Sequence, residues 1–149
     1  MNQKELDVIL EKHDKWLINE EGGEKANLSY ANLCGLDLSY LDLTGADLSN
    51  VNLSRANLSS TILRDVNLNG SMLYWTNTED IKGIEVRKIQ FNTSRNNNAL
   101  SYWVDLGIWT TGCFQGTKDE LIESILKTHE DNVELKNKYL KAITYLEEM

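Results

Sequence analysis

The amino-acid sequence predicts a short solenoid of stacked turns, with a helix before it and a small module of strands and helices after it. Leucine recurs at every fifth position from Leu28 to Leu73, ten times without a miss. A period of five fits neither an α-helix nor a simple β-strand, and a short fixed repeat is typical of a solenoid. The predicted domains are therefore residues 1–25, the repeat body at 26–77, and a C-terminal module at 78–149.

Residues 1–25 are predicted to form a capping helix and a linker. The apolar side chains that share one helical face over residues 3–19 are Leu6, Ile9, Leu10, His13 and Leu17. Gly22 and Gly23 then end the helix. We expect His13 to pack its ring beside Trp16, because no second histidine or cysteine lies at metal-ligand spacing from it.

Each repeat has two inward positions and three outward ones. The leucine and the small or apolar residue two places before it point inward, which fills a narrow interior. Asn or Asp precedes the leucine in eight of the ten repeats, and hydroxyl residues mostly follow it. Because these residues favour tight turns, the chain is expected to turn a corner about every five residues.

The repeats ANLSY, ANLCG and ADLSN resemble the pentapeptide-repeat family, whose pattern is A(D/N)Lxx. The resemblance covers residues 26–75 and implies a mainly β fold, a right-handed quadrilateral β-helix with four repeats in each coil. It implies about two and a half coils, a stack roughly 12 Å tall at the usual strand spacing. The leader LEKHDKWLINEEGGEKANLSYANL also resembles the segment before the repeats in phage and prophage members.

The C-terminal module is predicted to be α+β, with a three-stranded antiparallel meander and two helices. Strand-like runs cover residues 84–91, 100–104 and 107–114. Thr117 and Glu120 form a capping box that opens a helix to about residue 129, and a second helix follows over about 132–148. The side chains expected to face inward are Leu121, Ile122, Ile125, Leu126, Tyr139, Leu140, Ile143 and Leu146.

The composition limits where the chain works and what it binds. A net charge of −8 argues against direct binding to nucleic acid, since that affinity comes mainly from cationic contacts to phosphate. No apolar run of about eighteen residues predicts a membrane span, and the N-terminus shows no secretory signal. We therefore expect a cytoplasmic protein, in the cytoplasm of the host cell if a phage encodes it, with both cysteines reduced.

The sequence predicts no enzyme, no cofactor and no metal. The one conceivable nucleophile pair is Cys113 with His129. The helix between them is about 18 Å long, so contact would need another element to fold back. Cys113 is instead expected to be a buried, small apolar residue.

The best-known pentapeptide-repeat proteins, the quinolone-resistance type, resemble B-DNA in shape and charge and bind DNA gyrase. If this chain were such a DNA mimic, its acidic surface would come from Asp37, Asp42, Asp47 and Asp65. Positions twenty residues apart should stack, and none of the first three has an aspartate twenty residues later. The DNA mimic is therefore the alternative function rather than the leading one.

The leading hypothesis is a non-catalytic protein-binding module, a phage or prophage accessory protein that inhibits a host protein by occlusion. The partner expected is a host nucleic-acid-handling or defence protein, contacted through the C-terminal module. The candidate contact residues are Tyr102, Trp103, Asp105, Trp109, Glu120, Glu123, Glu130, Asp131 and Glu134. A structural or assembly subunit is a further alternative, and the sequence leaves a homodimer open.

Overall fold

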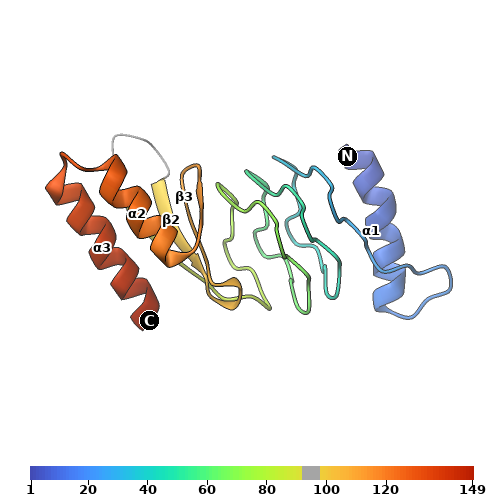
Figure 1. Cartoon of the computed structure of the whole chain (residues 1–149). Coiled ribbons are helices and arrows are strands. Elements are labelled where there is room, and N and C mark those ends of the chain that lie inside the picture. The colour runs from blue at the N-terminus through green and yellow to red at the C-terminus, as the bar shows by residue number, and fades with distance from the viewer. Residues whose placement is uncertain (92–97) are drawn as a thin grey trace. The chain divides into compact units, whose positions relative to one another are not determined.

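A computed structural model of the chain describes residues 1–91 and 98–149. It divides into two compact units, Met1–Glu85 and Val86–Met149 (Figure 1). The first unit holds the N-terminal helix together with the whole repeat body. The division falls after Glu85, eight residues later than the boundary that the sequence predicts.

The N-terminal helix α1 spans Gln3–Leu17, and Asn2 caps its first turn in a reciprocal box with Glu5. Leu6 and Leu10 are buried on its inner face. After the helix the chain folds back closely, and a Cβ on Gly23 would lie 2.4 Å from the backbone nitrogen of Trp16. Only glycine fits at that close approach.

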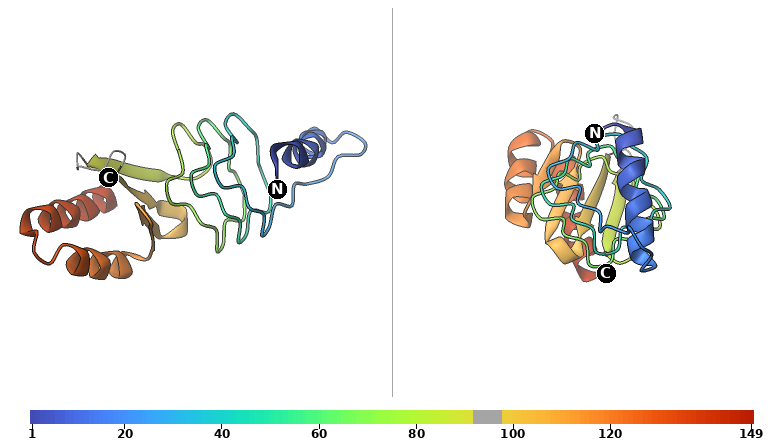
Figure 2. Two further views of the ribbon diagram at one scale, coloured as in Figure 1. Left: turned by 90° about the horizontal axis from the view of Figure 1, so that it is seen from above. Right: turned by 90° about the vertical axis from the view of Figure 1, so that its right-hand side faces the viewer.

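The repeat body is a stack of coils with four repeats in each. Eight parallel β-bridges, from Asn27–Asp47 to Ile62–Lys82, each join residues twenty apart. The left view in Figure 2 shows these coils stacked side by side along one axis. All ten leucines of the series are buried inside, and the second inward position is filled by small residues such as Ala46 and Ala56. The inward assignment is confirmed for the leucines, whereas Ala31, Leu36, Leu41 and Val66 are only partly buried and the outward Ser54 is buried.

The coils continue further than the leucine series. The backbone amide of Leu58 donates to the Asn77 carbonyl at 2.9 Å, and that of Leu63 donates to the Lys82 carbonyl at 2.7 Å. Thr78, only 8% exposed, takes the inward leucine position in this last coil. The predicted end at residue 77 was too early because the backbone ladder persists after leucine is lost. Three coils make a stack about 14 Å tall.

The corners of the coils lie in the left-handed region of the backbone. The last residue of each repeat from Tyr30 to Asp80 has a φ between 52° and 74°, whether or not it is glycine. Asn or Asp before the leucine supports most of these turns, as where Asn27 Oδ1 accepts the Ser29 amide at 3.1 Å. The sequence pattern thus fixes both the inward side chains and the corners.

The second unit contains a four-stranded antiparallel sheet in the order β1-β2-β3-β4. Its strands are Val86–Phe91, Asn98–Trp103, Ile108–Thr111 and Phe114–Gly116. The sequence predicted three strands, and the third, at 107–114, is in fact split by a tight turn. Gly112 there has a φ of 52°, and Cys113 beside it is exposed, not buried as expected. Residues 92–97, between the first two predicted strands, lie outside the described residues.

Helices α2 (Lys118–Thr128) and α3 (Val133–Glu148) pack with this sheet. Thr117 and Glu120 form the predicted capping box. The shared core consists of Leu100, Trp109, Leu121, Ile125, Tyr139, Ala142, Ile143 and Leu146. Leu126, predicted to face inward, is instead 45% exposed.

Candidate functional site

One outer face of the coils carries a ladder of hydrogen-bonded side chains. Asn57 Nδ2 donates to Asp37 Oδ1 at 3.1 Å, and Asn77 Nδ2 donates to Asn57 Oδ1 at 3.0 Å. These three residues occupy the same repeat position in successive coils, twenty residues apart. The ladder therefore fixes side chains along the whole height of the stack.

Asp37 is also tied to its own turn. Its Oδ1 accepts the Ser39 hydroxyl at 2.7 Å and the Ser39 amide at 3.0 Å. The hydrogen bond from the Ser39 hydroxyl, then that from the amide, and to a lesser degree that from Asn57, hold the pKa of the Asp37 carboxyl below its usual value. Asp37 is thus a fixed negative charge at an exposed position.

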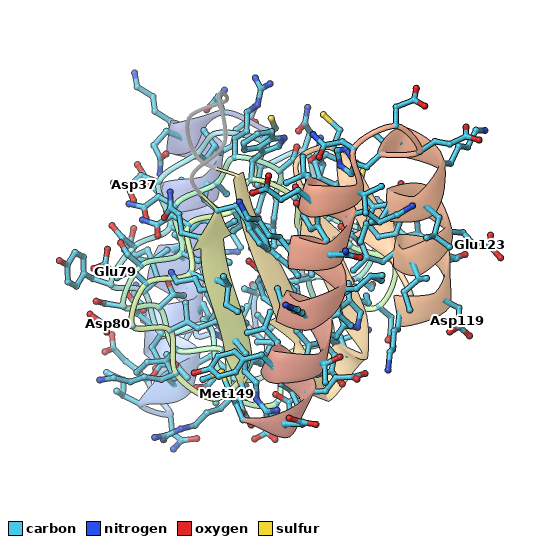
Figure 3. The ribbon with its side chains drawn as sticks, turned by 90° about the vertical axis from the view of Figure 1, so that its left-hand side faces the viewer. Asp37, Glu79, Asp80, Asp119, Glu123 and Met149 are labelled. Atoms are coloured by element: carbon cyan, nitrogen blue, oxygen red, sulfur yellow. The ribbon has the colours of Figure 1, made fainter. Side chains whose placement is uncertain are left out.

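The same face gains two more carboxylates from the third coil, Glu79 and Asp80. Both are exposed, as is Asp37. Figure 3 shows all three projecting on the same side of the stack. We call this surface the Asp37 face. The residues at its outward positions are Asp37, Ser39, Tyr40, Asn57, Ser59, Ser60, Asn77, Glu79 and Asp80, and none is a lysine or arginine.

An aromatic residue stands out on the Asp37 face. Tyr40 is 81% exposed and sits at a left-handed corner with a φ of 62°. A side chain in this conformation costs about 1–2 kcal/mol relative to the right-handed region. The corner conformation is shared by the last residue of every repeat, so the feature that distinguishes Tyr40 on this face is its exposed aromatic ring.

Charge is distributed unevenly along the chain. Residues 1–85 carry fourteen carboxylates and seven lysines or arginines, a net charge of −7. Residues 86–149 carry nine and eight, a net charge of −1. Nearly all of the net negative charge therefore belongs to the unit that contains the Asp37 face. Little of it belongs to the C-terminal module, in which the sequence predicts the contact region.

A family profile for pentapeptide repeats matches residues 24–55 and 42–77. Over this span the chain is a pentapeptide-repeat protein. Among solved structures it is similar to the pentapeptide-repeat protein Rfr23 from the cyanobacterium Cyanothece 51142, with 38% identity and a TM-score of 0.38. That match covers 39% of this chain and 40% of the other.

It is also similar to HetL from Nostoc sp. strain PCC 7120, described as involved in the regulation of heterocyst differentiation. This match has 34% identity and a TM-score of 0.26, and it covers 39% of this chain and 28% of HetL. The chain thus spans less than half the length of both structures. A search of the curated proteins returned no match.

The other aspartates proposed for a DNA mimic do not join the Asp37 face. Asp42 and Asp65 belong to repeats of a second face, whose outward positions also include Arg64 and Lys82. Asp47 lies on a third face. Its pKa is lowered, first by the backbone and side-chain hydrogen bonds of its own turn and less by Asn67. Glu79 and Asp80 lie beyond the predicted end of the repeat, although counting on in fives past Trp75 leads to them.

Of the aromatic candidates in the C-terminal module, the two tryptophans are buried and the tyrosine is partly buried. Trp103 and Trp109 are each 1% exposed, and Tyr102 stacks on Trp109 with ring centroids 4.3 Å apart. Neither indole is available to a partner in this structure. The two tryptophans lie on opposite sides of the sheet, and both are buried.

The acidic candidates of the same module are scattered. Glu120 Oε2 accepts the Thr117 amide at 2.7 Å, and this bond, followed by that of the Thr117 hydroxyl, lowers its pKa. Glu134 forms an ion pair with Lys138 at 2.7 Å. The exposed remainder are Asp105 after β2, Glu123 on α2, and Glu130 and Asp131 in the turn before α3. Glu120 thus serves the helix cap, and Glu134 pairs within its own helix.

The structure separates the residues that the sequence offered for chemistry. Within residues 1–91 and 98–149, no three His, Cys, Asp or Glu side chains lie close enough to hold a metal ion. His129 stacks on Tyr139, with ring centroids 5.4 Å apart, while Cys113 is exposed in its turn. None of the described helices is both long and apolar enough to cross a membrane.

Proposed function

We propose that this pentapeptide-repeat protein is a non-catalytic protein-binding module that holds a cationic segment of its partner on the Asp37 face. The observation that carries the proposal is the coincidence, on one ladder-braced face, of three exposed carboxylates and an exposed tyrosine. The proposed contact region therefore lies on the coils, whereas the sequence predicts it on the C-terminal module.

The ladder lowers the entropic cost of binding at this face. Ordering a free side chain at an interface costs about 0.5–1.5 kcal/mol. Asp37 and Asn57 are already held by hydrogen bonds, so they lose little freedom when a partner docks. Tyr40 adds contact area with few rotatable bonds, which is why tyrosine is enriched at interfaces.

The chemistry of the face indicates the class of partner. A carboxylate surface without cations attracts lysine- and arginine-rich segments, and such attraction weakens as salt rises. Proteins that handle nucleic acid present surfaces of that kind to phosphate. Occlusion of a host protein of this class by a phage-borne accessory protein is the role that fits the face.

The test is a pull-down with three forms of the full chain. The first is the unmodified chain, and the second is D37N/E79Q/D80N. Asparagine already occupies the equivalent of position 37 in the next two coils, so this change should keep the ladder. The third form, D119N/E123Q/E130Q, removes three carboxylates from the C-terminal unit and serves as the matched control.

We expect the partner to be retained by the unmodified chain and the control, and lost by the face variant. Binding of the purified partner should weaken at least tenfold in the face variant and should fall with added salt. Loss of the partner from the D119N/E123Q/E130Q form alone would instead place the contact on the C-terminal module and overturn the proposal.

The DNA-mimic function is the second candidate, and one observation favours it. Glu79 and Asp80 stand two coils from Asp37 on one face, about 10 Å along the stack axis. That separation is close to three base-pair steps of a DNA strand, at roughly 3.4 Å each. If this function holds, the unmodified chain should inhibit gyrase supercoiling and duplex DNA should displace it. Partner binding that duplex DNA does not displace would exclude mimicry.

A further inference from the structure

The connection between α1 and the coils contains a buried histidine. His13 lies on the inner face of α1 and is 0% exposed. Its Nδ1 accepts the backbone amide of Ala26 at 3.1 Å. Ala26 is the first inward residue of the first coil, so this bond links the helix directly to the start of the repeat body.

The hydrogen bond defines the protonation state of His13. A ring nitrogen that accepts carries no proton, so the proton of the neutral ring must sit on Nε2. Nε2 is buried and has no hydrogen-bond partner among the described residues. The ring also stacks on Trp16, with centroids 5.4 Å apart and planes 12° from parallel, as the sequence predicted. The site is thus built for a neutral imidazole.

Three charged groups act on His13 from the surrounding elements. Asp14 on the same helix and Asp42 on the first coil favour the protonated form, while Lys25 in the connecting segment disfavours it. Burial is the largest influence, and Lys25 acts in the same direction, so the pKa of His13 lies below its ordinary value. The two carboxylates moderate this effect without reversing it.

We propose that His13 makes the docking of α1 onto the first coil acid-sensitive, so that protonation releases the helix and uncovers the N-terminal end of the stack. A proton on Nδ1 would remove the acceptor of the Ala26 amide. It would also place a positive charge in a site without solvent. Both effects weaken the docking of α1 onto the first coil.

The other polar links of the helix among the described residues are weak, so once that bond is lost the buried Leu6 and Leu10 are its main remaining hold. The Glu24 amide donates to the Lys12 carbonyl at 3.0 Å, which ties only the returning chain to the helix. The ion pair of Lys12 with Glu24 is exposed, and such pairs contribute about 0–1 kcal/mol. Figure 2 shows α1 lying across the N-terminal end of the coils, so its release would leave that end open.

The sign of the pH dependence follows from the lowered pKa. Docking is at full strength above the pKa of a free histidine, about 6.5. Below that pH the released helix takes up a proton that the docked helix resists. The docking equilibrium constant should then fall by up to about tenfold for each pH unit, until the docked ring itself is protonated.

The test uses nuclear magnetic resonance and hydrogen exchange on the full chain. His13 and His129 are the only histidines, so their ring signals can be assigned by comparison with H129N. Protection factors of amides in α1 are measured from pH 7.5 to pH 5 against those of the middle coil. H13N places an amide oxygen where Nδ1 accepts and cannot titrate, and H129N is the matched control.

We expect the His13 ring to be neutral with its proton on Nε2 and to titrate below 6.5. Protection of α1 should fall at least tenfold from pH 6.5 to pH 5 in the unmodified chain and in H129N, but not in H13N. If H13N fails to fold, the ring signals of the unmodified chain still test the proposal. A proton on Nδ1, titration at or above 6.5, or α1 protection that stays constant relative to the coils would overturn the proposal.

Discussion

The sharpest stability prediction concerns Leu53, an inward leucine of the middle coil. It is fully buried, and the leucines of the same stack position, Leu33 and Leu73, lie in the coils on either side. Replacing a buried leucine by alanine costs about 2.5–5 kcal/mol, with the higher values where the cavity cannot collapse. Backbone hydrogen bonds join the middle coil to both neighbours. The Leu33 amide donates to the Asn52 carbonyl at 2.9 Å, and the Leu53 amide donates to the Met72 carbonyl at 2.9 Å.

Because both neighbouring coils are held at fixed spacing, the cavity left by L53A should stay open. We therefore expect a loss of about 3–5 kcal/mol in the free energy of unfolding of the first unit. The matched control is L126A, the same substitution at a leucine that is 45% exposed, where the loss should stay below about 1 kcal/mol.

The assay is a urea titration followed through amide signals of the coils and of the sheet, which reports the two units separately. A loss of less than about 1.5 kcal/mol for L53A, or one equal to that of L126A, would mean that the leucine stack is not close-packed and would refute the reasoning.

Three further predictions follow. Y40G should stabilise the coils by about 1 kcal/mol in urea unfolding, because glycine tolerates the left-handed corner. The same substitution should weaken partner binding at least tenfold, because it removes the exposed ring. Y30G, the control, should stabilise the coils without changing partner binding. Since the pKa of Asp37 is lowered in the folded chain, the stability it adds is present above about pH 3.9 and lost as pH falls further, so D37N should flatten an acid-unfolding curve in that range. G23A should destabilise the first unit by more than G22A, whose cost should be about 1 kcal/mol in thermal unfolding, because only the first meets the helix backbone; equal costs would contradict the close approach.

Much of the first unit could be predicted from the sequence, because one side-chain type recurs at a fixed spacing. The leucines identify the interior, and the Asn or Asp before them identifies the turns. The end of the stack could not be predicted in the same way. Thr78 and Gly83 replace leucine in the last coil, while the backbone bonds that continue the coil leave no mark in the sequence.

The candidate site depended on that missing coil. Without Glu79 and Asp80, the carboxylate of Asp37 has no acidic neighbour on its face, so the sequence alone favours the C-terminal module as the contact region. There the sequence predicts Trp103 and Trp109 as contact residues, but both are buried. Burial set by tertiary packing cannot be read from a local pattern.

The measurement that tests the central claim most directly is an amide chemical-shift map of the labelled full chain with its captured partner. The proposed function predicts that the largest changes cluster at Ser39, Tyr40, Ser60 and Asp80, and that they fade as salt is raised. Changes concentrated on α2 and α3, with the Asp37 face undisturbed, would contradict it.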